Sequence, residues 1–416
     1  MHILYRTILF LSLPCTLFAG GSFVYEVSTT DIALASAGWA ARANDPSTAF
    51  TNPAGMTRFK RPELELGMGP LFAHLTFDAN NRTETPGSHG HANQWLPLGN
   101  SFLIYPFSDC VRFGLASTGY FGTSLKYNHN WVGRYYLQKT LMQGASLVPS
   151  VAYKINECWS VGFGLNAMYG FFRQRSAVNN RLDGISDGWV NLHDYRWGFG
   201  YIAGVLYEPS CHTRIGLQYI SHVRLHFRSI PRFHHLGTQL EGLLTQAGII
   251  GSEIDLETRV PESLILSAYQ QFNDQFALMV DVGWQRWNNW LRTIFSPVNS
   301  NSVTFRPRFK NCWHFAGGIE WYWNPRLTLL AGIAYDTTIV KRNNRTFNFP
   351  VTSQWRFGSG ARFAWNNNLN LEFGAELEWQ GKMFADQSRG PLGGRVAGHY
   401  HRSYVLFITS AMTWKF

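Results

Sequence analysis

Strict alternation of apolar and polar residues is the feature that most constrains how this chain can fold. Across residues 369–379 every second residue is apolar, and the positions between them include Glu372, Glu376 and Glu378. The same alternation runs through residues 158–173. A period of two is typical of β-strands, whose successive side chains point to opposite faces. Carboxylates are costly in lipid, so their face must look into a wet or satisfied interior.

The apolar content of the chain is high but dispersed. Hydrophobic residues make up 45% of the sequence and aromatic residues 16%, yet after residue 19 no apolar stretch approaches the roughly 20 residues of a transmembrane helix. This combination favours an all-β outer-membrane barrel in which lipid-facing and lumen-facing positions alternate. A large soluble all-β protein is the alternative that composition leaves open.

The first 19 residues have the order of an export signal. Arg6 precedes an apolar run, after which Pro14 and small residues lead to Ala19. We therefore predict a signal peptide over residues 1–19. Four cysteines of the exported part should stay free, because the predicted strand positions keep their Cα atoms beyond disulfide distance: Cys110, Cys158, Cys211 and Cys312.

Short turns and long loops alternate along the chain, and this rhythm predicts the number of strands. Tight turn signals join strand pairs near residues 108–109, 156–157, 209–210, 273–274, 324–325 and 366–368. Longer polar connections separate the pairs, near residues 79–95, 128–139, 174–192, 229–254, 293–309, 342–351 and 385–401. The runs between them predict a 14-stranded antiparallel barrel over residues 63–416. Bacterial barrels keep short turns in the periplasm, so both termini should be periplasmic.

The formal net charge of +10 comes without a basic run, which argues against a nucleic-acid partner. Scattered cations are expected to meet lipid phosphates, including those of lipopolysaccharide, or anionic groups in the lumen. On the predicted seventh strand, alternate residues form a basic ladder that we expect to face the lumen: His222, Arg224, His226 and Arg228. The ladder either guides anions inward or pairs with acidic residues of the wall: Glu372, Glu376 or Asp281.

Two motif types suggest chemistry that the sequence does not otherwise support. We expect that no cysteine or carboxylate completes a ligand set with the histidines of the predicted outer loops, so we predict no metal site. These histidines are His89, His91, His234, His235, His399 and His401. The Gly-x-Ser-x-Gly pattern over residues 184–188 has no strand before it and no helix after it, so we predict no enzymatic activity and no cofactor.

A segment before the first strand resembles the N-terminal plug of the FadL family of outer-membrane transporters. Residues 33–56 hold a run of small residues, then Asp45, then Asn52-Pro53-Ala54. Further matches follow in order at residues 153–167, 197–208 and 260–262. The resemblance implies a plug over residues 20–62 inside a 14-stranded barrel. It also implies passive transport of hydrophobic small molecules, most of all long-chain fatty acids, by a protein that we expect to be a monomer.

The resemblance also implies a sideways exit through a kink in the third strand. Glycines permit such a kink, so we predict it at Gly119 and Gly122. We expect the corner formed by Asn52, Pro53 and Ala54 to sit against this kink and to pair with the freed backbone groups.

A fatty-acid carboxylate needs a cationic partner in an apolar lumen. Ser176 and Phe305 stand where the best-known family members carry a clamping Arg and Lys. Either the clamp has moved, or the ligand is neutral. The neighbouring cations are the candidates for a relocated clamp: Arg173, Arg175, Arg306 and Arg308.

The last strand ends on Phe416, a terminal aromatic residue of the kind that the barrel-assembly machinery recognises. Two other functions are compatible with a barrel. A porin for small solutes needs an open lumen, which a plug would fill. A surface adhesin or receptor would act through the outer loops.

Overall fold

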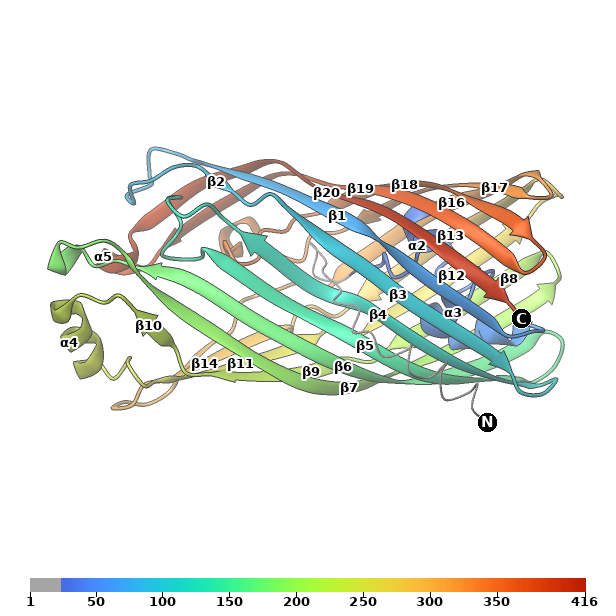
Figure 1. The fold of residues 1–416 in the computed structure, drawn as a ribbon, viewed down its shortest axis with the longest axis horizontal. Coiled ribbons are helices and arrows are strands. Elements are labelled where there is room, and N and C mark those ends of the chain that lie inside the picture. The colour runs from blue at the N-terminus through green and yellow to red at the C-terminus, as the bar shows by residue number, and fades with distance from the viewer. Residues whose placement is uncertain (1–23) are drawn as a thin grey trace.

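The computed structural model describes residues 24–416, which form a closed antiparallel barrel around a buried N-terminal segment (Figure 1). The predicted signal peptide, residues 1–19, lies outside the described residues. The strands of the first half are β1 (Glu63–Ala79), β2 (Gly90–His91), β3 (Gln94–Pro106), β4 (Val111–Lys126), β5 (Lys139–Lys154), β6 (Trp159–Val178), β7 (Gly188–Ser210), β8 (Thr213–Ile220), β9 (Val223–Ser229) and β10 (Arg232–His234).

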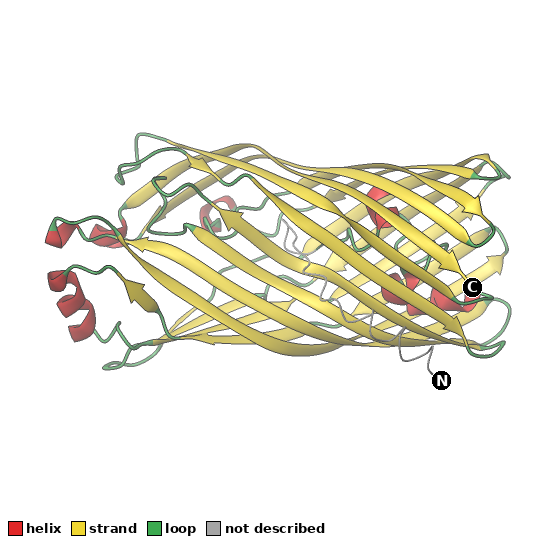
Figure 2. Cartoon of the chain, viewed as in Figure 1, coloured by secondary structure: helices red, strands yellow, loops and turns green. Residues whose placement is uncertain are grey.

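The second half supplies the remaining strands: β11 (Glu253–Val260), β12 (Ser263–Gln271), β13 (Phe276–Gln285), β14 (Leu291–Ser296), β15 (Val303–Phe305), β16 (Cys312–Asn324), β17 (Leu327–Asp336), β18 (Gln354–Asn366), β19 (Leu369–Ser388) and β20 (Arg395–Lys415). The helices are α2 (Thr29–Ala33), α3 (Thr48–Thr51), α4 (Thr238–Gln246) and α5 (Gly390–Gly393), with 3-10 turns η1 (Pro53–Arg58), η2 (Arg181–Asp183) and η3 (Arg342–Asn344). Helical segments occur in the plug and in the long loops (Figure 2).

The barrel closes where its first and last strands pair with each other. Neighbouring spans pair in chain order, β1 pairs with β20, and β7 pairs with β8. The seventh to tenth spans are each interrupted, so β9, β11, β14 and β15 form a separate small sheet that continues them. With these segments joined to their spans, the barrel has the predicted 14 strands. The C-terminus lies at the end that carries the short turns (Figure 1).

Alternation works as predicted in β19. The side chains of Glu372, Glu376 and Glu378 are buried inside, whereas Phe373 and Leu377 point outward and are exposed. The outward apolar residues contact lipid rather than water, and the carboxylates face the plug inside the barrel. Among residues 24–416, no helix is long and apolar enough to cross a bilayer.

The segment that precedes β1 is a plug, because almost every residue from 24 to 59 is buried. Ser28 caps α2 by accepting a hydrogen bond from the Asp31 amide at 3.1 Å. Small wall residues let the plug backbone come close. A Cβ at Gly332 would overlap the Leu34 carbonyl, and one at Gly358 would overlap the Ile32 carbonyl. The wall is therefore shaped to the backbone of the plug.

Candidate functional site

The plug corner at Asn52-Pro53-Ala54 packs against β6 and β7, so its predicted position against the third span was wrong. Asn52 Nδ2 donates to the carbonyls of Val205 at 3.0 Å and Ala40 at 2.6 Å. The corner lies where two wall glycines meet: Gly162 and Gly204 are direct cross-strand partners, and a Cβ on either would overlap the corner. Shape therefore decides its place, because only glycine allows a second backbone this close.

The third span carries an irregularity that includes Gly119, whereas Gly122 lies beyond it and pairs regularly with Gln143. The β3–β4 ladder ends at the pair Ser101 and Ser117, and the β4–β5 register shifts between Thr118 and Phe121. Among the described residues, no ladder pairing joins residues 94–100 of β3 to residues 118–126 of β4. The wall is thus unpaired over this stretch, apart from a side-chain hydrogen bond from Gln94 to the Ser124 carbonyl at 2.7 Å.

The first described residues of the plug, rather than its corner, pair with the irregular third span. The Val24 amide donates to the Tyr120 carbonyl at 2.9 Å, and the Thr118 hydroxyl donates to the Val27 carbonyl at 3.2 Å. Phe50 of the plug packs on the Tyr120 ring at 5.2 Å between centroids. These contacts supply the partners that a bulged strand needs. No sequence motif at residues 24–27 predicts these contacts.

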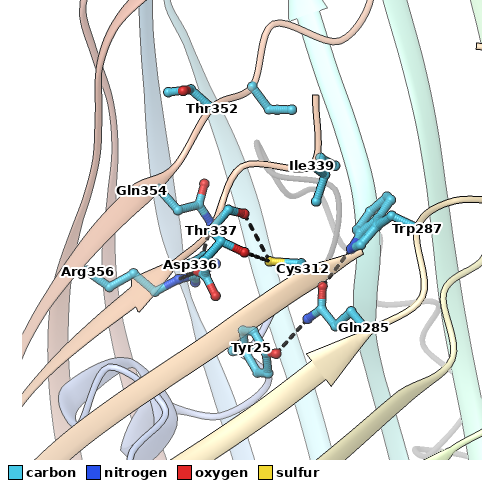
Figure 3. Close-up of a pocket in the computed structure, with 11 residues that line it drawn as sticks. Tyr25, Gln285, Trp287, Cys312, Asp336, Thr337, Ile339, Thr352, Gln354 and Arg356 are labelled. Carbon is cyan, nitrogen blue, oxygen red and sulfur yellow. Dashed lines mark hydrogen bonds and ion pairs between the residues drawn. The ribbon is translucent and has the colours of Figure 1, made fainter. Parts of the chain in front are cut away.

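The same plug segment is anchored on the opposite wall by a buried cation. Arg356 of β18 is 1% exposed; it pairs with Glu26 of the plug, and its Nε lies 2.8 Å from Asp336. Glu376 and Glu378 lie 3.6 and 3.9 Å from the guanidinium. Figure 3 shows Arg356 beside Asp336 in a pocket that Tyr25 also lines. Because carboxylates already surround Arg356, it offers little to a ligand carboxylate.

A second buried network fixes the middle of the plug. Arg42 lies 2.9 Å from Asp31 and 3.4 Å from Asp45, and Arg362 of β18 also reaches Asp45 and Glu372, at 3.5 and 2.6 Å. Burial raises the pKa of Asp31 to about 6, against the opposing effect of Arg42. Asp45 is equally buried, but Arg42 and Arg362 together hold its pKa below the usual value.

A cationic cleft lies between the segments 306–310 and 341–344. Its cations are Arg306, Arg308, Lys310, Lys341 and Arg342. All five are exposed, and none forms an ion pair with a described carboxylate. Arg306 and Arg308 were predicted from the sequence, whereas the other three come from the fold, which pairs Phe309 with Val340. We refer to this group as the cationic cleft.

Aromatic rings lead from the cationic cleft toward the third span. Phe309 of the cleft packs on Trp290 at 4.9 Å between centroids, and Trp290 packs on Phe349 at 4.3 Å. Trp290 also lies 6.5 Å from the ring of Phe121, at the register shift of β4. Trp290, Phe349 and Phe121 belong to one buried apolar cluster that also contains Tyr120, and the partly buried Phe309 packs against it. The cleft and the unpaired wall are therefore connected by continuous apolar packing.

Arg173 and Arg175 lie on the outer face of β6, so they cannot clamp a ligand in the lumen. Their side chains alternate with Phe172, which belongs to the buried lumen cluster. In the sequence, Arg173 follows Phe171 by two residues and so belongs to the residues that face the lipid. The structure places both side chains on this outer face. Arg175 lies in a row of cross-strand partners that runs over the outer face from β4 to β10. We refer to this row as the outer cationic row; it consists of Lys126, Lys139, Arg175 and Arg232, with Asn191 between the two arginines.

The basic ladder of the seventh span also faces outward, contrary to the prediction. Ser221 forms both hydrogen bonds with the backbone of Tyr201 on β7. Its amide donates to the Tyr201 carbonyl, and its side-chain hydroxyl accepts from the Tyr201 amide in place of a backbone carbonyl. The side-chain alternation reverses here, so Leu225 turns inward and Arg224 outward. The predicted partners were wrong as well. The ladder residues His222, His226 and Arg228 pair with acidic residues of the eighth span: Glu262, Asp255 and Glu253.

One carboxylate joins the histidines for which the sequence offered none. Asp78 of β1 lies with His399 and His401 of β20, and their donor atoms are all within 4.8 Å of one another. The prediction that nothing completes a ligand set was therefore wrong, because strand pairing unites the first and last spans. The thiol prediction is confirmed for the described residues: Cys110, Cys158, Cys211 and Cys312 are all free.

A barrel closed by an internal plug, with an apolar lumen and an unpaired stretch of wall, defines the class of outer-membrane channels for hydrophobic molecules. A profile of the family described as outer membrane protein transport protein (OMPP1/FadL/TodX) matches residues 11–416. The chain belongs to this family of bacterial outer-membrane transporters, which are not enzymes and which carry hydrophobic compounds.

Named relatives agree with this assignment, and solved structures share the fold. The long-chain fatty acid transport protein of Salmonella typhi is 26% identical over 370 residues, covering 80% of this chain and 81% of the relative. Outer membrane protein P1 of Haemophilus influenzae is 26% identical over 368 residues, covering 78% of each chain. The crystal structure of a Pseudomonas aeruginosa FadL homologue has a TM-score of 0.86 at 21% identity, covering 95% of this chain and 100% of that one. The Ralstonia pickettii toluene transporter TbuX has a TM-score of 0.66 at 16% identity, covering 94% and 100%.

Proposed function

We propose that this protein carries long-chain fatty acids across the outer membrane by passive diffusion and releases them sideways into the bilayer. The observation that supports this substrate is the cationic cleft. Among residues 24–416, no Asp or Glu lines this cleft, and it opens onto the aromatic cluster around Trp290. A ligand that fits both regions has an anionic head and a long apolar tail. Relatives named as long-chain fatty acid transport proteins support the same substrate class.

The head of the ligand is bound by charge-assisted hydrogen bonds. A carboxylate leaving water needs such partners, because an unpaired anion is costly to bury. Arg306 and Arg308 provide planar guanidinium groups that suit two carboxylate oxygens. The tail then packs on Phe309 and Trp290, where each buried methylene contributes about 0.8 kcal/mol.

Exit occurs at the third span. The wall beside Tyr120 and Phe121 lacks a complete ladder, and residues 24–27 of the plug cover its inner side. A shift of this short segment opens a path between β3 and β4, at a depth where the outer surface is apolar. The plug as a whole stays in place, which keeps polar solutes out and disfavours a porin.

Binding of the carboxylate is tested with the double variant Arg306→Ala/Arg308→Ala in purified protein. Affinity for a fluorescent fatty acid should fall by about 1.5–3 kcal/mol, the cost of losing a charge-assisted hydrogen bond. Affinity for a neutral alkane analogue should not change. Arg326→Ala, at an exposed turn, is the matched control. Equal loss for both ligands would show that the cleft acts by packing, and no loss would remove it from the path.

Lateral exit is tested by deleting Gly119, which removes the extra residue of the β4 irregularity and lets the strand pair regularly. Uptake of the fatty acid into cells should be lost, while the protein still migrates as a heat-modifiable barrel. Unchanged uptake would refute an exit at the third span.

We also propose that phosphorylated lipids, lipopolysaccharide in particular, contact the outer cationic row. Its cations form no ion pair with described carboxylates, in contrast to the ladder on β9. Replacing Lys126, Arg175 and Arg232 by Gln should reduce the phosphate that co-purifies with the protein, whereas Arg228→Gln, at a ladder cation already paired with Asp255, should not. Equal phosphate in both would contradict this role. We further propose that both termini lie in the periplasm and that Phe416, which is 69% exposed, is recognised there by the assembly machinery.

A further inference from the structure

A half-buried cluster of metal-binding side chains lies where the first and last spans of the barrel meet. Asp78 of β1 and His399 of β20 are direct cross-strand partners, and His401 opposes Thr76 two residues further along. Direct partners share a face of the sheet, so these side chains point outward, opposite to the buried pair Phe77 and Tyr400. One ligand atom from each of the three lies within 4.8 Å of the others.

The geometry of this cluster leaves a nitrogen without a hydrogen bond. His401 Nδ1 lies 2.8 Å from Asp78 Oδ2, but the atoms are not aligned for hydrogen bonding, and this buried nitrogen has no other hydrogen-bond partner among the described residues. The other oxygen of Asp78 lies 3.2 Å from His89 Nδ1. The carboxylate thus lies between two imidazoles, and His401 Nδ1 makes no hydrogen bond to the described residues.

The charge of Asp78 is poorly compensated compared with a neighbouring carboxylate on the same wall. Asp386 of β19 pairs with two permanent cations, Arg82 at 2.9 Å and Arg395 at 3.0 Å. Asp78 has only imidazoles around it. A bound dication would supply the missing positive charge and take up the free nitrogen at the same time.

We propose that Asp78, His399 and His401 bind a zinc ion on the outer face of the barrel. Two imidazole nitrogens and one carboxylate oxygen are ligands that zinc prefers, and in a tetrahedral site ligand atoms at about 2.0–2.2 Å from the metal stand a few Å apart. Calcium and magnesium select oxygen ligands and would gain little from two histidines. Water occupies the fourth position, and His89 holds the carboxylate as an outer partner.

The ion would join β1 to β20, the strands that close the barrel. Both ends of the folded chain would then be tied by a metal at the rim opposite the short turns. This site is independent of the ligand path, because its residues face outward and none belongs to the cationic cleft or to the plug.

The experiment is titration of untagged, full-length protein in detergent with zinc chloride, followed calorimetrically. We expect one ion per chain, and at least a tenfold loss of affinity in Asp78→Asn and in His401→Ala. His129→Ala, an exposed loop histidine outside the cluster, should bind as the wild type does. Zinc-edge anomalous scattering should place the ion between β1 and β20.

Several results would overturn the site. They are absence of zinc binding by the wild-type chain, unchanged affinity in both cluster variants, or competition by calcium at similar concentration. Heat-modified migration on a gel checks that each variant is folded. The wild-type titration does not depend on the variants, so a variant that fails to fold leaves the test intact.

Discussion

Replacing Arg356 by Met should release the N-terminal segment of the plug. The guanidinium is 1% exposed and is surrounded by the carboxylates of Glu26, Asp336, Glu376 and Glu378. Methionine fills a similar volume but carries no charge, so the substitution leaves these carboxylates buried without their cation. Breaking a buried ion pair in this way costs about 3–5 kcal/mol.

That cost falls on the docked state of the plug, because Glu26 can regain water when its segment leaves the wall. At about 1.4 kcal/mol per factor of ten, the undocked fraction should rise by roughly two to nearly four orders of magnitude. The assay is swelling of proteoliposomes in a small sugar, which reports polar leakage past the plug. Leakage should rise clearly above that of the wild type.

A second substitution separates loss of charge from loss of packing. Glu26→Gln in the Arg356→Met background removes the plug carboxylate that has lost its partner, so leakage should fall back toward the wild-type value. Arg395→Met is the surface control, since its pair with Asp386 is 38% and 35% exposed and such pairs contribute about 0–1 kcal/mol. Wild-type leakage in Arg356→Met, or no recovery in the double variant, would refute the anchoring role of this pair.

Three further outcomes follow from the same structure. Because burial raises the pKa of Asp31 to about 6, its contribution to plug docking is fully present below about pH 4 and is lost as pH rises through 6; leakage should therefore fall when pH drops from 7.5 to 5, and Asp31→Asn should remove that change. Gly204→Val should displace the plug corner, because its side chain would overlap Asn52. Gly317→Ala, whose nearest neighbour would be a carbonyl at 3.9 Å, should be silent in the same leakage assay. Maleimide in detergent should label the exposed thiols of Cys110, Cys158 and Cys211 but not Cys312, which is buried; mass spectrometry that finds a fourth label or a disulfide would contradict this.

Strands and their number could be predicted because the signals are local. Alternation sets the faces of β19, and each turn signal lies beside the strands that it joins. The reversal on the seventh span shows the limit of such signals. Apolar residues occupy the odd positions of 217–227 on both sides of Ser221, and only Ile220 and Ser221 depart from this alternation. The pattern therefore does not predict that the Ser221 hydroxyl replaces a backbone acceptor and that the side chains after it change face.

The candidate site was harder to predict because its contacts join distant segments. Glu26 and Arg356 meet only when the barrel closes around the plug, and Asp78 meets His399 only when β1 pairs with β20. The place of Asn52 depends on the shape of the wall at Gly162 and Gly204. Arg306 and Arg308 could be identified from the family pattern, but the three cations that complete their cleft required the fold.

The length of the strands determines how far the protein stands above the membrane. β7 has 23 residues, and at about 3.3 Å per residue it is roughly 76 Å long. With a tilt of about 40°, it rises about 58 Å along the barrel axis, more than twice the apolar band of about 25 Å that outer-membrane barrels bury. Much of the wall therefore extends outward through the hydrated sugar layer of the cell surface. If the ligand leaves sideways as proposed, a hydrophobic molecule that enters at the rim crosses this layer enclosed by protein and reaches hydrocarbon without passing through water.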